Sequence, residues 1–373
     1  MRMENKNTKH GLTVRGDSLY CPLPLSIEPY WYCEPDCPGC WFRGLNHVWG
    51  KEMRPIDVPS LKNKLTNGLL NKTPKSFLAH CLVRKKTIKL GNKTDPFQPI
   101  EEELKRSTGA IQVLVDLDWT FVVQTRFITR AWEMNKDVLK KAHDCNLVTV
   151  LPIISTGMEL DWEILEAKRT EPIPERLRTI SRIIKSGIPL GVNGEPFVPG
   201  FHTVEMFEDA IKRLKDIGVK SYNTYNYHFT PFVAKRLVNI PGIDIEKIWY
   251  YNQDARWKLI LPQLIEIAKK HDMILGCPDF VNSGIKHCEM ANTCCGIDVP
   301  NPCTFNTHYF KALAQKGMLP EEIISQTFDG SGDIEEGRAI INGTAKDMYT
   351  LKDAGVCTAP FKRVKKEKGS FGL

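Results

Sequence analysis

Residues 87–126, TIKLGNKTDPFQPIEEELKRSTGAIQVLVDLDWTFVVQTR, decide the fold class of this chain. The segment begins and ends with short β-branched runs, 87–92 and 120–126, which predict two strands. Between them, the apolar residues of 100–117 recur at helical spacing and predict a helix. A strand, a helix and a second strand in this order form a βαβ unit, and such units build parallel sheets.

The same alternation continues toward the C-terminus. Further strands are predicted at 148–155, 189–197, 220–229 and 273–277. Further helices are predicted at 135–145, 174–187, 203–218 and 254–272, and glycines close two of them at Gly187 and Gly218. No GxGxxG motif opens a helix anywhere, which disfavours a Rossmann sheet. About six βα units therefore predict an α/β fold, a partial (β/α)6 TIM-like barrel.

Composition limits the class of protein. A chain of 373 residues can form two average domains or one large barrel, and 42% hydrophobic and 25% charged residues are ordinary globular values. The polar start and the lack of an apolar run of roughly 18 residues predict no secretory signal and no membrane span. We therefore expect a cytoplasmic protein. Its twelve cysteines favour metal or redox chemistry over disulfides, and its formal charge of +7 permits a polyanionic partner.

Three cysteines lie close together in IEPYWYCEPDCPGCWF, residues 27–42. Cys33, Cys37 and Cys40 are near enough in sequence to bind one metal ion or one cluster. An electron-transfer [4Fe–4S] cluster takes four thiolates, so three thiolates leave one iron open to a substrate or cofactor. The alternative is a zinc site completed by Cys21 or His47.

The spacing C-x3-C-x2-C resembles the signature of the radical SAM superfamily. Five blocks in the same order resemble its spore photoproduct lyase-like branch, often labelled DNA repair photolyase, over about residues 28–205. The blocks are EPYWYCEPDCPGCWF (28–42), GNKTDPFQPIE (91–101), QTR (124–126), RTEPIPERL (169–177) and SGIPLGVNGEPFVPGFHTVE (186–205). The resemblance implies a partial barrel of the radical SAM type with a Cys-rich C-terminal extension.

The resemblance also implies two cofactors. Cys33, Cys37 and Cys40 would bind a [4Fe–4S] cluster whose open iron binds S-adenosylmethionine (SAM). Reductive cleavage of SAM would give a 5′-deoxyadenosyl radical that abstracts hydrogen from a substrate. A reducing partner such as flavodoxin or ferredoxin would supply the electron.

Polar residues that follow the predicted strands are candidates for SAM binding, because the working groups of a parallel barrel lie at the carboxyl ends of its strands. Gly91 would let the backbone approach the methionine moiety, and Arg126 or Arg169 could pair with the carboxylate. The alternative for each candidate is a solvated loop or an ion pair at the barrel mouth. The full set is Gly91, Asn92, Thr94, Asp95, Arg126, Ser155, Arg169, Asn193 and Glu195, of which Asn193 and Glu195 suit the ribose hydroxyls.

Two positions depart from the family pattern. The residue before the third cysteine is usually aromatic, and here it is Gly39. Asn92 stands where spore photoproduct lyase needs a hydrogen-donating cysteine. An amide does not readily give a hydrogen atom to a carbon radical, so repair of spore photoproduct itself is disfavoured.

Five more cysteines lie within residues 277–303. Four of them could hold an auxiliary iron–sulfur cluster, with Cys277, Cys288, Cys294 and Cys303 as the preferred ligands. Cys295, the neighbour of Cys294, would then be spare and is the candidate catalytic hydrogen donor. The alternative is a structural zinc with buried free thiols.

The substrate is predicted from composition. Aromatic residues interleave with amides in 221–229 and 249–257, which suits stacking and hydrogen bonding of a nucleobase, unless they pack the barrel core. The basic run 82–89 and the basic tail also suit DNA or RNA. We therefore expect an enzyme that modifies or repairs a nucleobase in nucleic acid. The alternatives are a radical SAM enzyme that modifies peptides or proteins, and a non-catalytic metal-binding module for nucleic acid.

The expected domain organisation has four parts. Residues 1–26 form an N-terminal extension, and residues 27–276 form the barrel. Residues 277–345 form the Cys-rich region. Residues 346–373 form a basic tail that we expect to be disordered.

Overall fold

The structure is a computed structural model that describes residues 9–14, 23, 25–40, 42, 52–74, 77–227 and 229–276. Within these residues, two sheets run in the orders β1-β2-β3-β4-β5 and β6-β7-β8. Only β1 pairs antiparallel with its neighbour, while the other pairs in both sheets are parallel. Parallel bridges from Val150 to Leu190 and from Ile153 to Asn193 join β5 to the second sheet. The described strands therefore form one continuous partial barrel.

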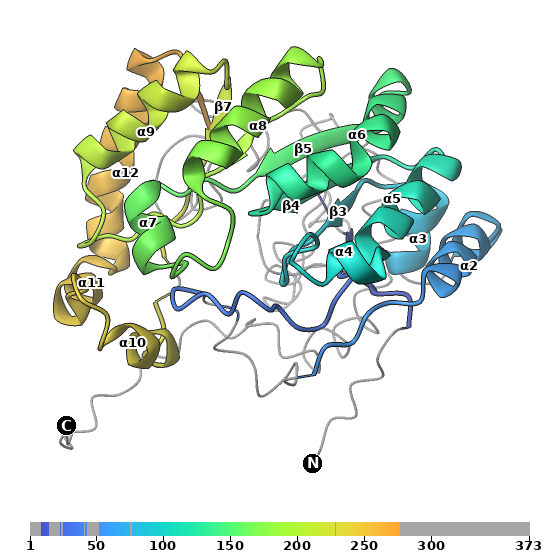
Figure 1. Cartoon of the computed structure of the whole chain (residues 1–373), viewed down its shortest axis with the longest axis horizontal. Coiled ribbons are helices and arrows are strands. Elements are labelled where there is room, and N and C mark those ends of the chain that lie inside the picture. The colour runs from blue at the N-terminus through green and yellow to red at the C-terminus, as the bar shows by residue number, and fades with distance from the viewer. Residues whose placement is uncertain are drawn as a thin grey trace, which may run out of the picture.

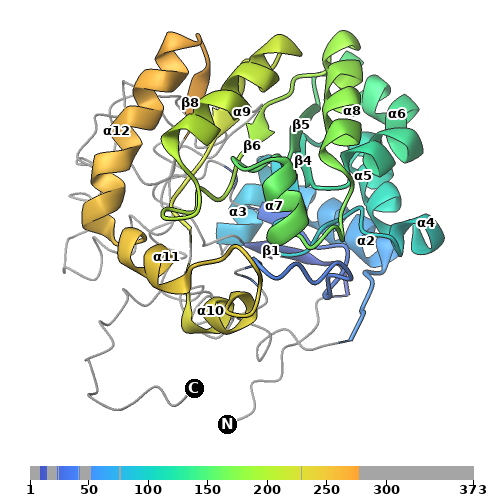
Figure 2. The same ribbon diagram turned by 60° about the vertical axis from the view of Figure 1, so that its left-hand side comes forward.

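The strands are short and the helices lie along their outer side, as Figures 1 and 2 show. The strands are β1 (Leu12–Val14), β2 (Leu25–Ile27), β3 (Ile88–Leu90), β4 (Phe121–Thr125), β5 (Val148–Pro152), β6 (Val192–Asn193), β7 (Ser221–Asn223) and β8 (Ile274–Gly276). The helices are α2 (Val58–Leu69), α3 (Phe77–Val83), α4 (Glu101–Leu104), α5 (Arg106–Asp116), α6 (Ile128–Asp144), α7 (Glu159–Ile164), α8 (Ile173–Lys185), α9 (Val204–Asp216), α10 (Pro231–Leu237), α11 (Ile245–Tyr251) and α12 (Asp254–Lys270).

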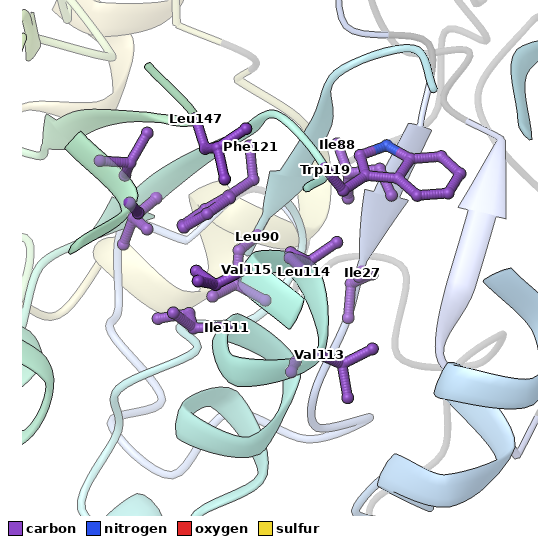
Figure 3. Close-up of a cluster of buried hydrophobic side chains, with 14 of the residues drawn as sticks. Ile27, Ile88, Leu90, Ile111, Val113, Leu114, Val115, Trp119, Phe121 and Leu147 are labelled. Atoms are coloured by element: carbon purple, nitrogen blue, oxygen red, sulfur yellow. The ribbon is translucent and has the colours of Figure 1, made fainter. Parts of the chain in front are cut away.

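Alternation along the strands sends apolar side chains outward to the helices. Ile88 and Leu90 of β3 and Phe121 of β4 pack with Ile111 and Leu114 of α5 in one buried cluster (Figure 3). A second cluster joins the outward residues of β6 to β8 with α9 and α12. Because successive strand residues point to opposite faces, the residues between these apolar positions face the barrel interior.

The inner face carries buried polar side chains. Lys89 lies between the outward residues of β3, and Thr149 lies between the outward residues Val148 and Val150 of β5. Gln124 lies on the same inner side of β4, one residue beyond Val123. On the opposite wall, the polar residues Asn193, Ser221 and Asn223 alternate with apolar residues that belong to the second cluster. The inside of the barrel therefore carries polar side chains on both walls.

The structure confirms the predicted α/β class and the parallel pairing of strands, with three differences in detail. The helix expected over 100–117 is two helices, α4 and α5, separated by Lys105 at φ 51°. The carboxylate of Glu101 accepts the N–H groups of Ser107 and Thr108, which satisfies donors at the start of α5. The sequence patterns did not predict the strands β1 and β2. They also did not predict the helices α2, α3, α7, α10 and α11.

The predicted domain boundaries lie partly beyond the described residues. β1 falls within residues 1–26, so the expected N-terminal extension contributes a strand to the sheet. β8 ends at Gly276, the last described residue, so the expected end of the barrel at 276 stays a prediction. Residues 277–345 and 346–373 lie outside the described part of the chain. Among the described helices, none combines the length and the apolar character needed to cross a lipid bilayer.

Candidate functional site

The three cysteines predicted to bind a cluster lie in one loop, residues 28–40, which follows the carboxyl end of β2. Cys33, Cys37 and Cys40 are half-buried, and the N–H of Cys40 donates to the carbonyl of Cys37 at 3.0 Å. Burial, the nearby Asp95 and the other two cysteines raise the pKa of Cys33 well above its usual value. Burial and Glu166 raise the pKa of Cys37 to about 12. Ionisation of Cys33 and Cys37 is therefore favoured only when a positively charged partner binds them.

The block TDPFQP holds this loop in place. Gln98 is fully buried, and its amide donates to the carbonyl of Tyr32 while its oxygen accepts from the N–H of Glu34. These two contacts, at 2.8 and 2.6 Å, bracket Cys33 on both sides. The hydroxyl of Thr94 donates to the carbonyl of Tyr30 at 2.7 Å. The block therefore positions the cysteine loop, and the hydroxyl proton of Thr94 is already donated in that contact.

Gly39, which departs from the family pattern, is held on both sides. Its N–H donates to the carbonyl of Leu165 at 2.9 Å, and its own carbonyl accepts from the hydroxyl of Tyr227 at 2.6 Å. A Cβ at this position would lie 3.0 Å from the Cβ of Leu165. The Cβ of an aromatic residue would be crowded by Leu165. The glycine therefore permits the close approach of the cysteine loop to Leu165.

Two arginines hold the outer side of the loop. Asp36 has a left-handed backbone with φ 46°. Its carbonyl accepts from Arg169 at 3.2 Å and from Arg236 of α10 at 2.9 Å, and its carboxylate pairs with Arg236 at 2.7 Å. The side chain of Arg169 is 51% exposed. The structure thus places Arg169 against the backbone of the cysteine loop rather than at a strand end.

Asp95 ties the loop after β3 to the end of β4. Its carboxylate accepts from the hydroxyl of Thr125 at 2.5 Å, from the N–H of Arg126 at 2.7 Å and from the N–H of Phe97 at 3.0 Å. Burial raises its pKa despite these donors. Since its oxygens are already engaged, Asp95 orients Arg126 and the cysteine loop.

Arg126, the predicted partner of the SAM carboxylate, belongs to a buried group of alternating charges. Its guanidinium pairs with Glu166 at 2.9 Å, and Glu166 pairs in turn with the fully buried Arg176. Arg176 also donates to the carbonyl of Ile153 at 3.1 Å and to the hydroxyl of Thr170. We call Arg126, Glu166 and Arg176 the charge triad.

The charge triad carries one more positive than negative charge beside the cysteines. Burial opposes ionisation of Glu166, but Arg176 and Arg126 outweigh it and lower its pKa to about 2. Burial would lower the pKa of Arg126, yet Glu166, Cys37, Asp95 and Cys40 outweigh that effect and raise it. The guanidinium of Arg126 is therefore close to the thiols and stays charged. A net positive charge in this place favours thiolates, an anionic cluster or a ligand carboxylate.

The loop Gly91–Thr94 has its shape set by Glu28, which is buried at the end of β2. One carboxylate oxygen of Glu28 accepts the N–H groups of Asn92, Lys93 and Thr94 at 3.1 to 3.4 Å. Gly91 has φ 78°, and a Cβ there would lie 2.4 Å from the Cδ of Pro96. The positive φ and the close approach of Pro96 therefore explain the glycine at position 91 without a bound ligand.

The other predicted SAM ligands lie on the far wall. Ser155 is buried just after β5, and Asn193 ends β6. The amide oxygen of Asn193 accepts the N–H of Glu195 at 2.9 Å, and Asn223 donates to the carboxylate of Glu195 at 3.2 Å. These residues follow neighbouring strands, so they belong to the same rim as the cysteine loop. The rim is the set of loops that follow the carboxyl ends of the strands.

The described thiols fit a cluster in their donor set and in their electrostatic surroundings. Among the described residues, no group of three or more histidine, cysteine, aspartate or glutamate side chains is arranged to bind a single metal ion. A [4Fe–4S] cluster makes a different demand, because each thiolate binds a separate iron. Three half-buried thiols on a clamped loop, facing the cations Arg126 and Arg176, meet that demand.

Some predicted residues cannot be placed. Cys277, Cys288, Cys294, Cys295 and Cys303, together with the alternative zinc ligands Cys21 and His47, lie outside the described residues. Other residues of the site were not predicted at all, namely Glu28, Gln98, Glu166, Arg176 and Arg236. Gln98 and Arg176 do fall inside the quoted sequence blocks, which was the available signal. Glu28 also opens the quoted block 28–42, whereas Glu166 and Arg236 lie outside the quoted blocks and carried no local signal.

The aromatic stretches divide into two environments. Tyr222 and Tyr227 are buried, so this part of 221–229 packs the barrel, as its alternative interpretation held. Trp249, Tyr250 and Tyr251 of α11 are 53%, 49% and 37% exposed, and Arg256 lies 3.5 Å from the ring centre of Tyr250. The exposed aromatic residues with an adjacent guanidinium remain suited to stacking on a base.

Comparison with known proteins shows the fold. The structure is similar to spore photoproduct lyase in complex with a dinucleoside spore photoproduct, with a TM-score of 0.52, 12% sequence identity, and coverage of 71% of this chain and 79% of the lyase. It is also similar to SuiB of Streptococcus suis bound to S-adenosylmethionine, with a TM-score of 0.47, 10% identity, and coverage of 69% and 50%. No family model and no curated protein sequence matches the chain. The resemblance to spore photoproduct lyase, inferred from sequence blocks, is confirmed for the fold.

Proposed function

We propose that this chain is a radical SAM enzyme that acts on a nucleobase in nucleic acid. One observation carries the proposal: Cys33, Cys37 and Cys40 lie on a single clamped loop at the carboxyl ends of parallel strands, beside the net positive charge triad. When bound, a [4Fe–4S] cluster and SAM supply a 5′-deoxyadenosyl radical by one-electron reduction of SAM. The predicted class of enzyme, whether lyase, isomerase or oxidoreductase, stays open.

The residues of the chain have separable roles in this proposal. The three cysteine thiolates bind three irons and leave the fourth iron for SAM. Arg126 presents its guanidinium to the SAM carboxylate, since it lies at the end of β4 and stays charged beside the thiols. Arg169 has a positioning role through the backbone of Asp36. Asn193 and Glu195 lie at the end of β6, where their polar atoms can bind the ribose hydroxyls.

Three features support a nucleic acid substrate. A protein of the same fold binds a dinucleoside spore photoproduct. The chain has a formal charge of +7, and α11 exposes the aromatic residues Trp249, Tyr250 and Tyr251. Asn92 takes the place of the hydrogen-donating cysteine, so the reaction differs from repair of spore photoproduct. Cys295 is the proposed hydrogen donor, and Cys277, Cys288, Cys294 and Cys303 are the proposed ligands of a second cluster.

The proposed cellular setting follows the same logic. A flavodoxin or ferredoxin would deliver the electron, and the protein would act in the cytoplasm. The barrel, which includes β1 and β2, would end at residue 276 and be followed by the Cys-rich region and a basic tail. If the substrate screen finds a peptide or protein substrate, that substrate class would replace nucleic acid in the proposal.

The test of this function is the formation of 5′-deoxyadenosine. The chain is reconstituted anaerobically with iron and sulfide, iron and sulfide are counted, and SAM is added with dithionite. The triple variant Cys33→Ala, Cys37→Ala, Cys40→Ala should make no 5′-deoxyadenosine, whereas the control Cys145→Ala, an exposed thiol, should match the wild type. Product formation by the triple variant at the wild-type rate would falsify the assignment.

The same preparation tests the second cluster and the substrate. With two clusters the wild type carries about eight irons, and the triple variant keeps about half of them. A triple variant that retains no iron, or binds one zinc, contradicts the second cluster. DNA, RNA and peptides are then screened for a change of mass that depends on SAM. A change confined to peptides would assign the enzyme to protein modification instead.

A further inference from the structure

The inner face of the barrel carries a lysine side chain that has no partner among the described residues. Lys89 is 6% exposed and lies on β3 with its neighbours Ile88 and Leu90 packed outward against the helices. Among the described residues, its ammonium has no hydrogen bond and no ion pair. An ammonium on the inner wall of a barrel with no counter-charge among the described residues is available to bind an anion.

The nearest carboxylate by register is already engaged. Lys89 pairs across the sheet with Ser26, and Glu28 lies two residues further along the same strand direction. Glu28 accepts three N–H groups of the loop after β3 and the hydroxyl of Ser26. The described part of the barrel therefore fixes Glu28 to the rim and leaves Lys89 without an ion-pair partner.

Hydrogen-bonding atoms on the same inner face are also unpartnered. Thr149 lies in the same register row as Lys89, with Val122 between them, and its hydroxyl is buried with no partner. The side-chain oxygen of Gln124, the next inward residue of β4, is buried without a partner too. On the facing wall the same holds for the hydroxyl of Ser221. Since buried polar groups in native proteins are almost always satisfied, a set of this kind indicates a ligand.

We propose that the inner face of the barrel binds an oxyanion of the substrate, with Lys89 as its cation and Thr149 as a hydroxyl donor. The hydroxyl of Ser221 faces the barrel interior from the other wall and can donate to the same ligand. The choice of a nucleotide phosphate as the oxyanion rests on the proposed function. The existence of an anion site does not depend on it. This site lies beneath the rim and is separate from the cysteine loop and the charge triad.

The test compares ligand pairs that differ in one charged group. The thermal unfolding midpoint of the whole chain is measured with uridine 5′-monophosphate against uridine, and with N-acetylglutamate against N-acetylglutamine, at constant ionic strength. A ligand that binds only the folded state raises the midpoint, so the charged member of a pair should raise it further. The variants are Lys89→Met, which preserves side-chain length, and the control Lys141→Met on the exposed side of α6.

The expected result has two parts. The monophosphate stabilises the wild type and the control more than uridine does, and Lys89→Met weakens its binding by at least about tenfold, as loss of a charge-assisted hydrogen bond requires. Without ligand, Lys89→Met should melt no lower than the wild type, because it removes a cation that has no partner among the described residues and keeps the apolar length of the side chain. Loss of a structural lysine would lower the melting point.

Each other outcome is decisive. Equal stabilisation by both members of both pairs overturns the anion site, as does a full monophosphate effect in Lys89→Met or a lower melting point of that variant. Stabilisation by N-acetylglutamate alone keeps the anion site and overturns phosphate as its ligand. If Lys89→Met does not fold, Thr149→Val serves in its place and should weaken monophosphate binding several-fold. Failure to cleave SAM would contradict the proposed function and leave these binding results unchanged.

Discussion

The rim and the inner face of the barrel differ in how fully their polar side chains are hydrogen-bonded within the described chain. At the rim, Glu28, Asp95 and Gln98 each make two or more hydrogen bonds to other parts of the chain. On the inner face, Thr149, Gln124 and Lys89 leave a hydrogen-bonding atom or a charge without a partner among the described residues. The rim is thus pre-organised before any ligand binds, which is the requirement for holding a cofactor in one geometry. The inner face keeps its binding capacity for a molecule that is not part of the chain.

The largest test of this difference removes the central charge of the rim. Glu166→Gln leaves Arg126 and Arg176 buried without their carboxylate, so the free energy of unfolding should fall by about 3–5 kcal/mol. Urea denaturation at pH 7 measures the loss. The control Glu163→Gln removes a carboxylate that is 51% exposed and should cost less than about 0.5 kcal/mol. A loss below about 1 kcal/mol in Glu166→Gln would mean that the charge triad does not organise the rim.

The pH dependence of stability sharpens the same test. The pKa of Glu166 is lowered from its ordinary value of 4.5 to about 2 in the fold, so its ionised form stabilises the fold above pH 4.5. That stabilisation is lost as the pH falls from about 4.5 to about 2. Because glutamine does not titrate, Glu166→Gln should lose less stability than the wild type over this window. Parallel curves for the two proteins would contradict the assignment of the lowered pKa to Glu166.

A smaller effect separates the two arginines that the sequence proposed for SAM. Arg126→Ala should weaken SAM binding by about 1.5–3 kcal/mol, the scale of a hydrogen bond to a charged group. Arg169→Ala should weaken it by less than about 1 kcal/mol, since Arg169 is half exposed and contacts the loop backbone. Equilibrium binding of SAM to the reconstituted protein measures both. Equal losses in the two variants would place both guanidinium groups at the ligand.

The smallest test is a matched pair of threonines. Thr94→Val at the rim loses the hydrogen bond to the carbonyl of Tyr30 and should cost about 1 kcal/mol of unfolding free energy. Thr149→Val on the inner face removes a buried hydroxyl that has no partner, so it should be neutral or stabilising by up to about 1 kcal/mol. Chemical denaturation of both variants gives the difference. If Thr149→Val is the more destabilising variant, the inner face is satisfied within the fold.

The sequence predicted the parallel fold because the pattern of each βα unit can be recognised within a short stretch of residues. Alternating apolar runs in 87–126 and the glycines after α8 and α9 act within a few residues, and the structure has the elements in those places. Local patterns failed where an element is short or its pattern weak. Three-residue strands such as β2 cannot show periodicity, and the break at Lys105 depends on Glu101 capping the helix that follows.

The sequence by itself also determined the ligands of the candidate cluster, because Cys33, Cys37 and Cys40 are neighbours along the chain. Only the tertiary structure decided what surrounds them. Glu166 meets Arg126 across 40 residues, and Arg236 reaches Asp36 across 200. It also decided that Lys89, one of several basic residues in 82–89, points into the barrel while its neighbours pack outward. Electrostatic and hydrogen-bonding partners depend on distance in space, which the order of residues does not encode locally.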